Sequence, residues 1–424
     1  MNFIAICLHC LDMRDFHSQM RETPFLDRLR GESVFVPMGR AQGHNQGDSL
    51  NAELTGVWTA RYCNSKLTAS GYTRPASFWL PETVLERLEA EGYDILTAID
   101  HDPRHRLGTF AVSGGMANYW LKNEPDRLAQ FSSPDRMSRA EWLERIKSSE
   151  RFYAHIFVRE THRPWAQEGD LYGLLGSRKR AWYEDRRQQK LKTWWPFDAE
   201  VARRAALQKA DAFAALRRKA LAMADGIVAE IFEATRDRDD VTYIVYSNHG
   251  EVFDHFRYTQ RYAVRAVEGA KLIEGTSHGA YPYEVLYANM QMWLVPGLSP
   301  RVMGGIGRLI DFAPTVLELA GTEHGDMDGE SMLPSFTAGA FPRRDRYAEC
   351  PDGAISMVRA DGWKLIAVSA APERRFADHG LAVFELETDP YEYVNLIDTP
   401  AGQEVLTWAM AKHEELAQSR PPAG

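Results

Sequence analysis

The chain has 424 residues, of which 44% are hydrophobic and 26% are charged, as is typical of a soluble globular enzyme. Its formal net charge of −9 argues against nucleic-acid binding as the main activity. Four cysteines in so long a chain do not make a disulfide framework. The N-terminus lacks the basic and apolar regions of a signal peptide, and no apolar stretch is long enough to span a bilayer. These features predict a cytoplasmic protein with no membrane partner.

The first predicted strand is the apolar run from Phe3 to Leu8, which ends at His9 and Cys10. Ligands of open α/β sheets bind outside the carboxyl ends of the strands, so His9 and Cys10 are candidate ligands. The alternative is a hydrogen-bonded core histidine beside a small buried cysteine. Further on, residues 23–29 predict a short helix whose N-cap is Thr23.

Residues 41–56 are small and polar and lead into a helix, with Asp48 or Ser49 as the predicted N-cap and Gly56 at its end. The free N–H groups and the dipole at a helix start favour an anion. If the helix begins early, Gln46 and Ser49 share one face. Capping alone is the alternative explanation of Asp48 and Ser49.

Strands are also predicted at residues 93–99, 152–158 and 241–246, with a helix at residues 213–234. A polar segment with a histidine follows each of these strands. Because parallel strands end at one edge of a sheet, their histidines are expected to gather in one cleft. The histidines concerned are His9, His101, His162 and His249 just past strands, and His44 and His278 in nearby loops. Imidazole ligates zinc, copper, iron or nickel and transfers protons near neutral pH.

The strand at 241–246 stops abruptly at a short polar stretch. Asn248 offers a carbonyl oxygen and His249 an imidazole nitrogen side by side, which can ligate a metal or hold an anionic substrate. A polar loop that caps the strand, with Asn248 favouring a turn, explains the same residues without a site.

The character of the chain changes near residue 341. Residues 355–368 alternate around an Asp-Gly turn and predict a hairpin, residues 383–386 a further strand, and residues 403–418 a helix. We therefore expect a mostly parallel α/β domain at residues 1–340, which carries the site, and an α+β C-terminal subdomain at residues 341–424.

Several motifs resemble those of sulfatase-like proteins of the alkaline phosphatase superfamily, over nearly the whole chain. The segments concerned are Thr23–Leu29, Leu54-Thr-Gly56, Thr161–Trp165, Ser247-Asn-His-Gly-Glu251, Ile310–Gly321, Asp361–Leu365 and Phe384–Leu396. The last two match the C-terminal subdomain of the family and are highly specific. The resemblance implies a mostly parallel central sheet between helices, and a metal-dependent site for an anionic ester.

The departures from the family pattern fall on the site. His9 and Cys10 stand where members place two metal ligands, Asp-Asp or Asp-Gln, and Asn248 stands where they place a metal-binding Asp. Gln46 occupies the position of the nucleophile, which is a formylglycine, Ser or Thr in the family. The Cys-x-Pro-Ser-Arg motif that directs formylglycine formation is absent. The resemblance therefore implies an atypical, non-formylglycine site.

Loss of these carboxylates disfavours calcium, which prefers anionic oxygen ligands. The set of His9, Cys10, Asn248 and His249 favours zinc or another transition metal. Such an ion can activate water, which makes a side-chain nucleophile unnecessary. The alternative is that Ser49 attacks, with a neighbouring histidine as its base.

The sequence thus predicts a metal-dependent hydrolase or transferase for a small anionic ester or related bond. We expect His162, His278, Ser49 and His101 to be catalytic. His162 and His278 match family residues that contact the metal or the substrate anion. Gln46, His44 and Arg163 are the candidate substrate-binding residues. A pseudoenzyme that binds a ligand on the same fold, or a non-hydrolytic metal enzyme, is the alternative. The sequence leaves the substrate open and allows a homo-oligomer.

Overall fold

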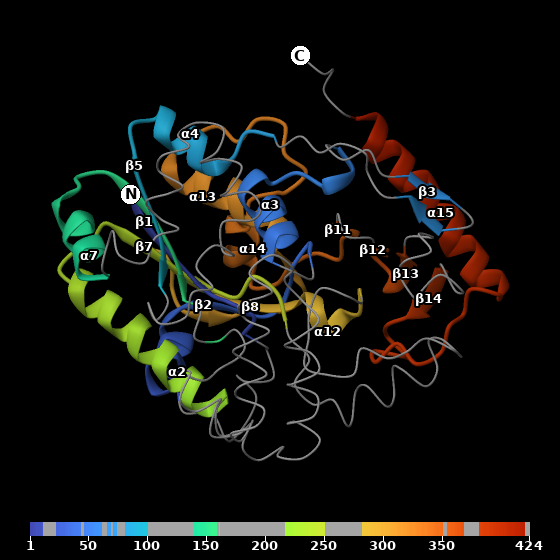
Figure 1. The fold of residues 1–424 in the computed structure, drawn as a ribbon, viewed down its shortest axis with the longest axis horizontal. Coiled ribbons are helices and arrows are strands. Elements are labelled where there is room, and N and C mark those ends of the chain that lie inside the picture. Colours follow the sequence, from blue (N-terminus) through green and yellow to red (C-terminus); the bar gives the residue numbers. More distant parts are fainter. Residues whose placement is uncertain are drawn as a thin grey trace, which may run out of the picture.

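A central sheet organises the larger part of the chain (Figure 1). The computed structural model describes residues 1–11, 23–43, 46–61, 66–68, 71–73, 81–100, 139–158, 161, 217–250, 282–350, 354–368 and 381–419. Within these residues the sheet has the order β10-β2-β8-β7-β1-β6-β5, and β9 pairs with β2. Its strands are β1 (Asn2–Leu8), β2 (Val34–Arg40), β5 (Asp94–Asp100), β6 (Phe152–Val158), β7 (Val241–Tyr246), β8 (Ala288–Leu294), β9 (Arg301–Val302) and β10 (Gly307–Arg308).

The centre of the sheet is parallel. β1 pairs in parallel with β6 and with β7, and β5 pairs in parallel with β6. β8 runs antiparallel to both β7 and β2, so the sheet is mixed but mostly parallel, as predicted. Every residue of β1, β6 and β7 is buried, which explains why these strands are continuous apolar runs. Their registers bring the carboxyl ends of the three strands to one edge.

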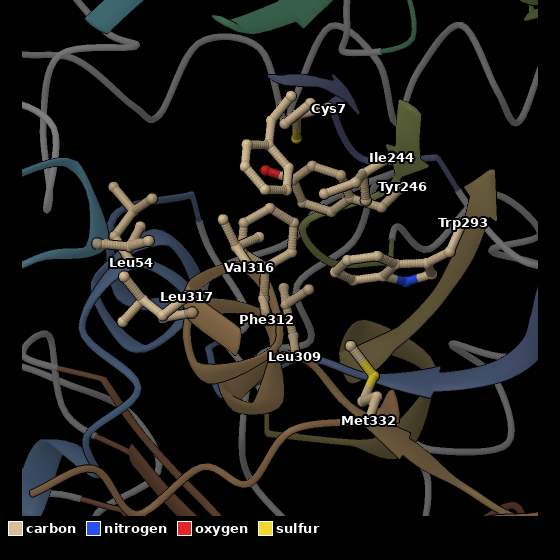
Figure 2. Close-up of a cluster of buried hydrophobic side chains, with 14 of the residues drawn as sticks. Cys7, Leu54, Ile244, Tyr246, Trp293, Leu309, Phe312, Val316, Leu317 and Met332 are labelled. Atoms are coloured by element: carbon tan, nitrogen blue, oxygen red, sulfur yellow. The ribbon is translucent and has the colours of Figure 1, made fainter. Parts of the chain in front are cut away.

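Helices cover both faces of the sheet (Figure 1). One face packs against α3 (Gln46–Thr55), α4 (Val84–Ala90), α13 (Phe312–Ala320) and α14 (Leu333–Ala338). The other packs against α2 (Pro24–Glu32), α7 (Arg139–Ser148) and the helical residues 217–235. On the first face, the Phe312 ring lies 5.3 Å from that of Tyr246 and 5.5 Å from that of Trp293 (Figure 2). The sheet is therefore shielded from water on both sides.

Tertiary contacts set the starts of two helices. α3 begins at Gln46, so the prediction of Asp48 or Ser49 as its N-cap is wrong. Ser49 lies in the first turn, where its hydroxyl donates to the carbonyl of Asn248. α2 begins at Pro24 as predicted, but the Thr23 side chain makes no capping hydrogen bond. The Asp225 carboxylate accepts instead from the N–H groups of the second and third residues of α2, at 3.1 and 2.7 Å.

The C-terminal part contains an antiparallel sheet of β11 (Arg346–Cys350), β12 (Ala354–Val358), β13 (Trp363–Val368) and β14 (Leu381–Glu385). β12 and β13 form the predicted hairpin, in which Gly362 adopts a φ of 94°. α15 (Pro400–Gln418) begins three residues earlier than predicted, because Thr399 caps it through the N–H of Gly402 at 3.0 Å.

This sheet and α15 share their core with an earlier segment. Trp58 and Leu67 pack in the same hydrophobic cluster as Leu365 and Leu406. The segment includes η1 (Thr59–Arg61), β3 (Lys66–Thr68) and β4 (Gly71–Thr73). The C-terminal part therefore depends on residues far before 341, and the predicted domain boundary stays a prediction.

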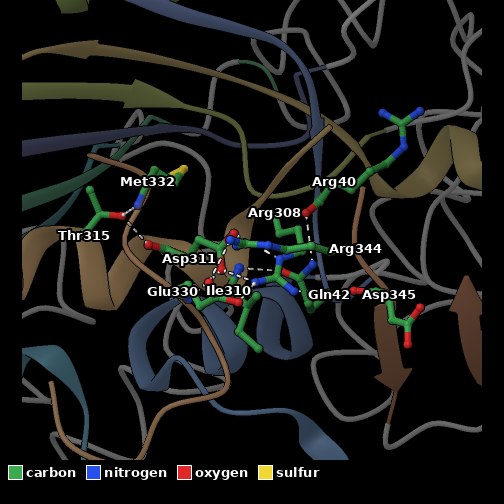
Figure 3. A network of polar contacts seen from close by, with 10 residues as sticks. All are labelled: Arg40, Gln42, Arg308, Ile310, Asp311, Thr315, Glu330, Met332, Arg344 and Asp345. Carbon is green, nitrogen blue, oxygen red and sulfur yellow. Dashed lines mark hydrogen bonds and ion pairs between the residues drawn. The ribbon is translucent and has the colours of Figure 1, made fainter. Parts of the chain in front are cut away.

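A buried polar network fixes the loop that leads into α3 (Figure 3). Arg308 donates to both carboxylate oxygens of Asp311, at 3.0 and 2.7 Å, at the start of α13. Beside this pair, in η2 (Leu309–Asp311), the N–H of Ile310 donates to Gln42 Oε1 at 2.6 Å. Gln42 lies four residues before α3, so the network positions the helix whose first turn approaches the site. None of the described helices is both long and apolar enough to cross a bilayer.

Candidate metal centre

Two neighbouring strands bring their end residues together. His9 and Cys10 follow β1, and Asn248 and His249 follow β7, which pairs with β1 in parallel. Each of the four residues is at most 1% exposed. Residues separated in sequence by about 240 positions thus become neighbours because two parallel strands end at the same edge of the sheet.

The side chains of His9, Cys10 and His249 form a group that could hold a metal ion. One ligand atom of each lies within 4.8 Å of the others. Cys10 Sγ is 3.5 Å from His249 Nε2, and the two imidazole rings meet edge to face with centroids 5.6 Å apart. Within the described part of the chain, this convergence is what the sequence predicted for these three residues.

The distances and hydrogen bonds of this group fit a zinc-like ion. Zinc–sulfur and zinc–nitrogen bonds of about 2.3 and 2.0–2.1 Å at a tetrahedral angle separate the two ligand atoms by about 3.5–3.6 Å. The observed separation of 3.5 Å between Cys10 Sγ and His249 Nε2 agrees with this value. His249 Nδ1 lies 2.8 Å from the carbonyl oxygen of Gly250, which can only accept. Nδ1 therefore carries the proton and Nε2 the lone pair, which is the tautomer in which a histidine ligates a metal through Nε2.

The backbone of the group is held by Asn248. Its Oδ1 accepts hydrogen bonds from the N–H of Cys10 and the N–H of His249, both at 3.1 Å. Cys10 adopts a φ of 57°, a left-handed conformation that is uncommon outside glycine. The bond from its N–H to Asn248 helps to hold this conformation. Because an amide oxygen has two lone pairs, both are occupied, and neither is left for the metal ligation that the sequence predicted for Asn248.

Two buried hydroxyl groups also hydrogen-bond to the backbone of this group of residues. Ser49 Oγ donates to the carbonyl of Asn248, and Thr161 Oγ1 donates to the carbonyl of His9 at 2.5 Å. The guanidinium of Arg217 donates to the carbonyl of Thr161. Ser49 thus lies beside the group as predicted, but its proton is directed to a carbonyl oxygen and not to a histidine base.

The other predicted site residues lie outside the described structure. These are His44, His101, His162, Arg163 and His278. Gln46 is the first residue of α3, and the structure describes its backbone but not its side chain. Their catalytic and substrate-binding roles stay predictions.

A second buried polar group joins side chains of β6, β7 and α3, and it was not among the residues predicted from the sequence. The hydroxyl of Tyr246 pairs with the Glu53 carboxyl and lies 2.8 Å from His155 Nε2. His155 Nδ1 is 3.3 Å from the hydroxyl of Tyr153. Burial raises the pKa of Glu53 to about 8, against the opposing hydrogen bond from Tyr246, and lowers the pKa of His155 to about 3.

Two patterns in the sequence could have found this group. Tyr153 and His155 alternate on one face of β6, the face covered by α3. Glu53 follows Ser49 by four residues and so shares its helix face. Neither pattern indicates a polar group unless it is known that α3 covers the face of β6 that carries Tyr153 and His155.

No protein-family model matches the sequence, and no curated protein matches it. Solved structures do match, over nearly the whole chain. A phosphonate monoester hydrolase of Agrobacterium radiobacter is 13% identical, with a TM-score of 0.61 over 98% of this chain and 95% of its own.

Two further solved structures are similar. A protein in complex with its substrate D-glucosamine-2-N,6-O-disulfate is 15% identical, with a TM-score of 0.60 over 99% of each chain. A 2-O GAG sulfatase is 14% identical, with a TM-score of 0.59 over 98% of this chain and 92% of its own. At such low identities these similarities show the fold alone.

Proposed function

Because the chain has the sulfatase-like fold of the alkaline phosphatase superfamily, we propose that it is a metal-dependent hydrolase or transferase of a small anionic ester. The observation that carries this proposal is the convergence of His9, Cys10 and His249 at the carboxyl edge of the parallel strands. Two of the similar structures are a phosphonate monoester hydrolase and a 2-O GAG sulfatase by name, which supports an ester of a tetrahedral oxyanion as substrate.

The donor set supports a zinc-like ion over calcium. Two imidazole nitrogens and a thiolate suit borderline-soft ions, whereas calcium takes six to eight oxygen ligands. Such an ion supplies Lewis acidity and lowers the pKa of water, so that no side-chain nucleophile is needed at Gln46. His9, Cys10 and His249 would hold it. The three ligands found among the described residues match the number of protein ligands that catalytic zinc sites have.

The chain's own residues would orient the ligands and the substrate. The Gly250 carbonyl keeps the proton on His249 Nδ1, which keeps Nε2 available. Ser49 and Thr161 fix the backbone carbonyls of Asn248 and His9. We assign the binding of the anion and the transfer of protons to His162 and His278, with His101, His44, Gln46 and Arg163 as further candidates.

Metal analysis tests the ion. Protein purified without added metal is expected to contain about one zinc or other transition ion per chain. His9→Ala should lose it, whereas Glu233→Ala, on the exposed face of the helical residues 217–235, should keep it. Purified protein that binds no transition ion, even after its addition, would contradict the proposal.

A panel of sulfate, phosphate and phosphonate esters tests the reaction. We expect turnover of at least one class, abolished by a chelator and restored by zinc. A protein that binds these anions without turning any over would instead favour a ligand-binding pseudoenzyme.

The composition further supports a cytoplasmic location and no nucleic-acid partner, which fractionation and binding assays would check.

A further inference from the structure

The side-chain amide of Asn248 has a fixed orientation. Its Oδ1 receives the N–H groups of Cys10 and His249, both at 3.1 Å. Two N–H donors cannot point at an NH₂ group, so the atom between them must be the oxygen. The hydrogen-bond network thus identifies the other amide atom as Nδ2.

The amide nitrogen is left without an acceptor. Asn248 is fully buried, and within the part of the chain that the structure describes Nδ2 has no hydrogen-bond partner. Burying an N–H donor without an acceptor costs free energy, so such a group needs an explanation. Nδ2 shares a carbon atom with the oxygen that accepts the backbone N–H groups of Cys10 and His249, the residues whose side chains are proposed metal ligands.

We propose that Asn248 is a catalytic residue whose NH₂ group donates a hydrogen bond to an oxygen of the bound anionic ester. A carboxylate at this position could accept from the same two N–H groups but would repel the anion. An amide keeps the backbone contacts and adds a donor where negative charge must be stabilised. The inference rests on the proposed function, since it assumes that a tetrahedral oxyanion binds beside His9, Cys10 and His249.

Asn248→Asp is the matched variant, because it keeps an oxygen for both N–H groups and removes only the NH₂ donor. Inorganic phosphate and sulfate are the probes, and calorimetry on the metal-loaded protein measures their dissociation constants. We expect Asn248→Asp to keep the metal at wild-type stoichiometry and to weaken phosphate binding by at least about ten-fold. Asn51→Asp, which adds the same charge on the buried side of α3, should change the dissociation constant of phosphate by less than about two-fold.

Nuclear magnetic resonance separates a hydrogen bond from charge repulsion. In protein labelled with ¹⁵N-asparagine, the Asn248 side-chain signal is the one that disappears in Asn248→Asp. Phosphate should move its NH₂ protons downfield in the wild-type protein. A signal that does not move while phosphate binds, loss of the metal in Asn248→Asp, or a protein that binds neither anion would overturn the inference. Metal content of the wild-type protein is measured separately, so failure of the proposed function is recognised independently.

Discussion

Two buried polar groups lie on neighbouring strands of the central sheet and differ in what they can hold. His9, Cys10 and His249 lie just past the ends of β1 and β7 and direct ligand atoms toward one another within 4.8 Å. In the second group, Glu53 of α3, Tyr246 of β7, and His155 and Tyr153 of β6 form a chain in which each group pairs with the next. Both groups are buried to a similar degree.

The two groups share histidines, and they differ in the arrangement of the polar atoms around them. Convergent lone pairs favour a cation, because one ion satisfies them all. A linear chain passes hydrogen bonds from one group to the next, although Glu53 Oε2 has no partner among the described residues. Burial then keeps Glu53 protonated and His155 neutral at neutral pH. A buried histidine or carboxyl group is therefore not by itself a sign of a site; the arrangement of its neighbours decides.

Removing one imidazole from each group should have the largest effect, because only one of the two variants is expected to lose the metal. His249→Ala removes a ligand and should lower zinc affinity by more than about 100-fold. Such sites bind zinc with a free energy of about 10–16 kcal/mol, and this energy is shared among only a few ligands. His155→Phe should keep the metal, because its ring stacks on Phe157 with centroids 4.8 Å apart and a phenyl ring fits the same contact. Metal analysis and a zinc competition assay measure both. Equal metal loss in the two variants would refute the distinction.

The pH dependence of stability should report on the deeper group. The pKa of Glu53 is raised from 4.5 in the unfolded chain to about 8 in the folded protein. Its protonation therefore contributes to the free energy of unfolding in full below pH 4.5, and this contribution is lost as the pH rises to about 8. Between pH 6 and 8 this amounts to about 2 kcal/mol. Glu53→Gln should remove that loss, as measured by urea unfolding at each pH.

Tyr246→Phe serves as the matched variant for this measurement. The hydrogen bond from Tyr246 lowers the pKa of Glu53, so its removal should raise that pKa further and extend the stability loss to higher pH. An unchanged pH profile in both variants would show that Glu53 is not the group responsible.

Ser49→Ala should have the smallest effect. It removes the hydrogen bond to the Asn248 carbonyl, which is worth about 1 kcal/mol of stability. If the metal supplies the reactivity, turnover of an active ester should fall by less than about ten-fold. If Ser49 is instead the nucleophile, turnover should fall by about 10⁴-fold or more. Steady-state kinetics with wild-type protein as the control distinguishes the two.

The amino-acid sequence by itself determined the strands, the fold and part of the site. The apolar runs that became β1, β6 and β7 are buried on both faces, and this burial leaves a pattern that can be read locally. The rule that ligands bind at the carboxyl ends of such strands selected His9, Cys10 and His249 together with Asn248, His101 and His162, and the side chains of the first three converge in the described structure.

Only the tertiary structure decided the roles of the polar residues around them. The contact of Asn248 Oδ1 with Cys10, the hydrogen bond of Ser49 to Asn248, and the capping of α2 by Asp225 all join residues about 200 or more positions apart in the sequence. The Glu53–Tyr246–His155 chain likewise needs α3 to lie on one particular face of the sheet. Hydrogen bonds are directional and short, so their partners are known only once the elements have packed.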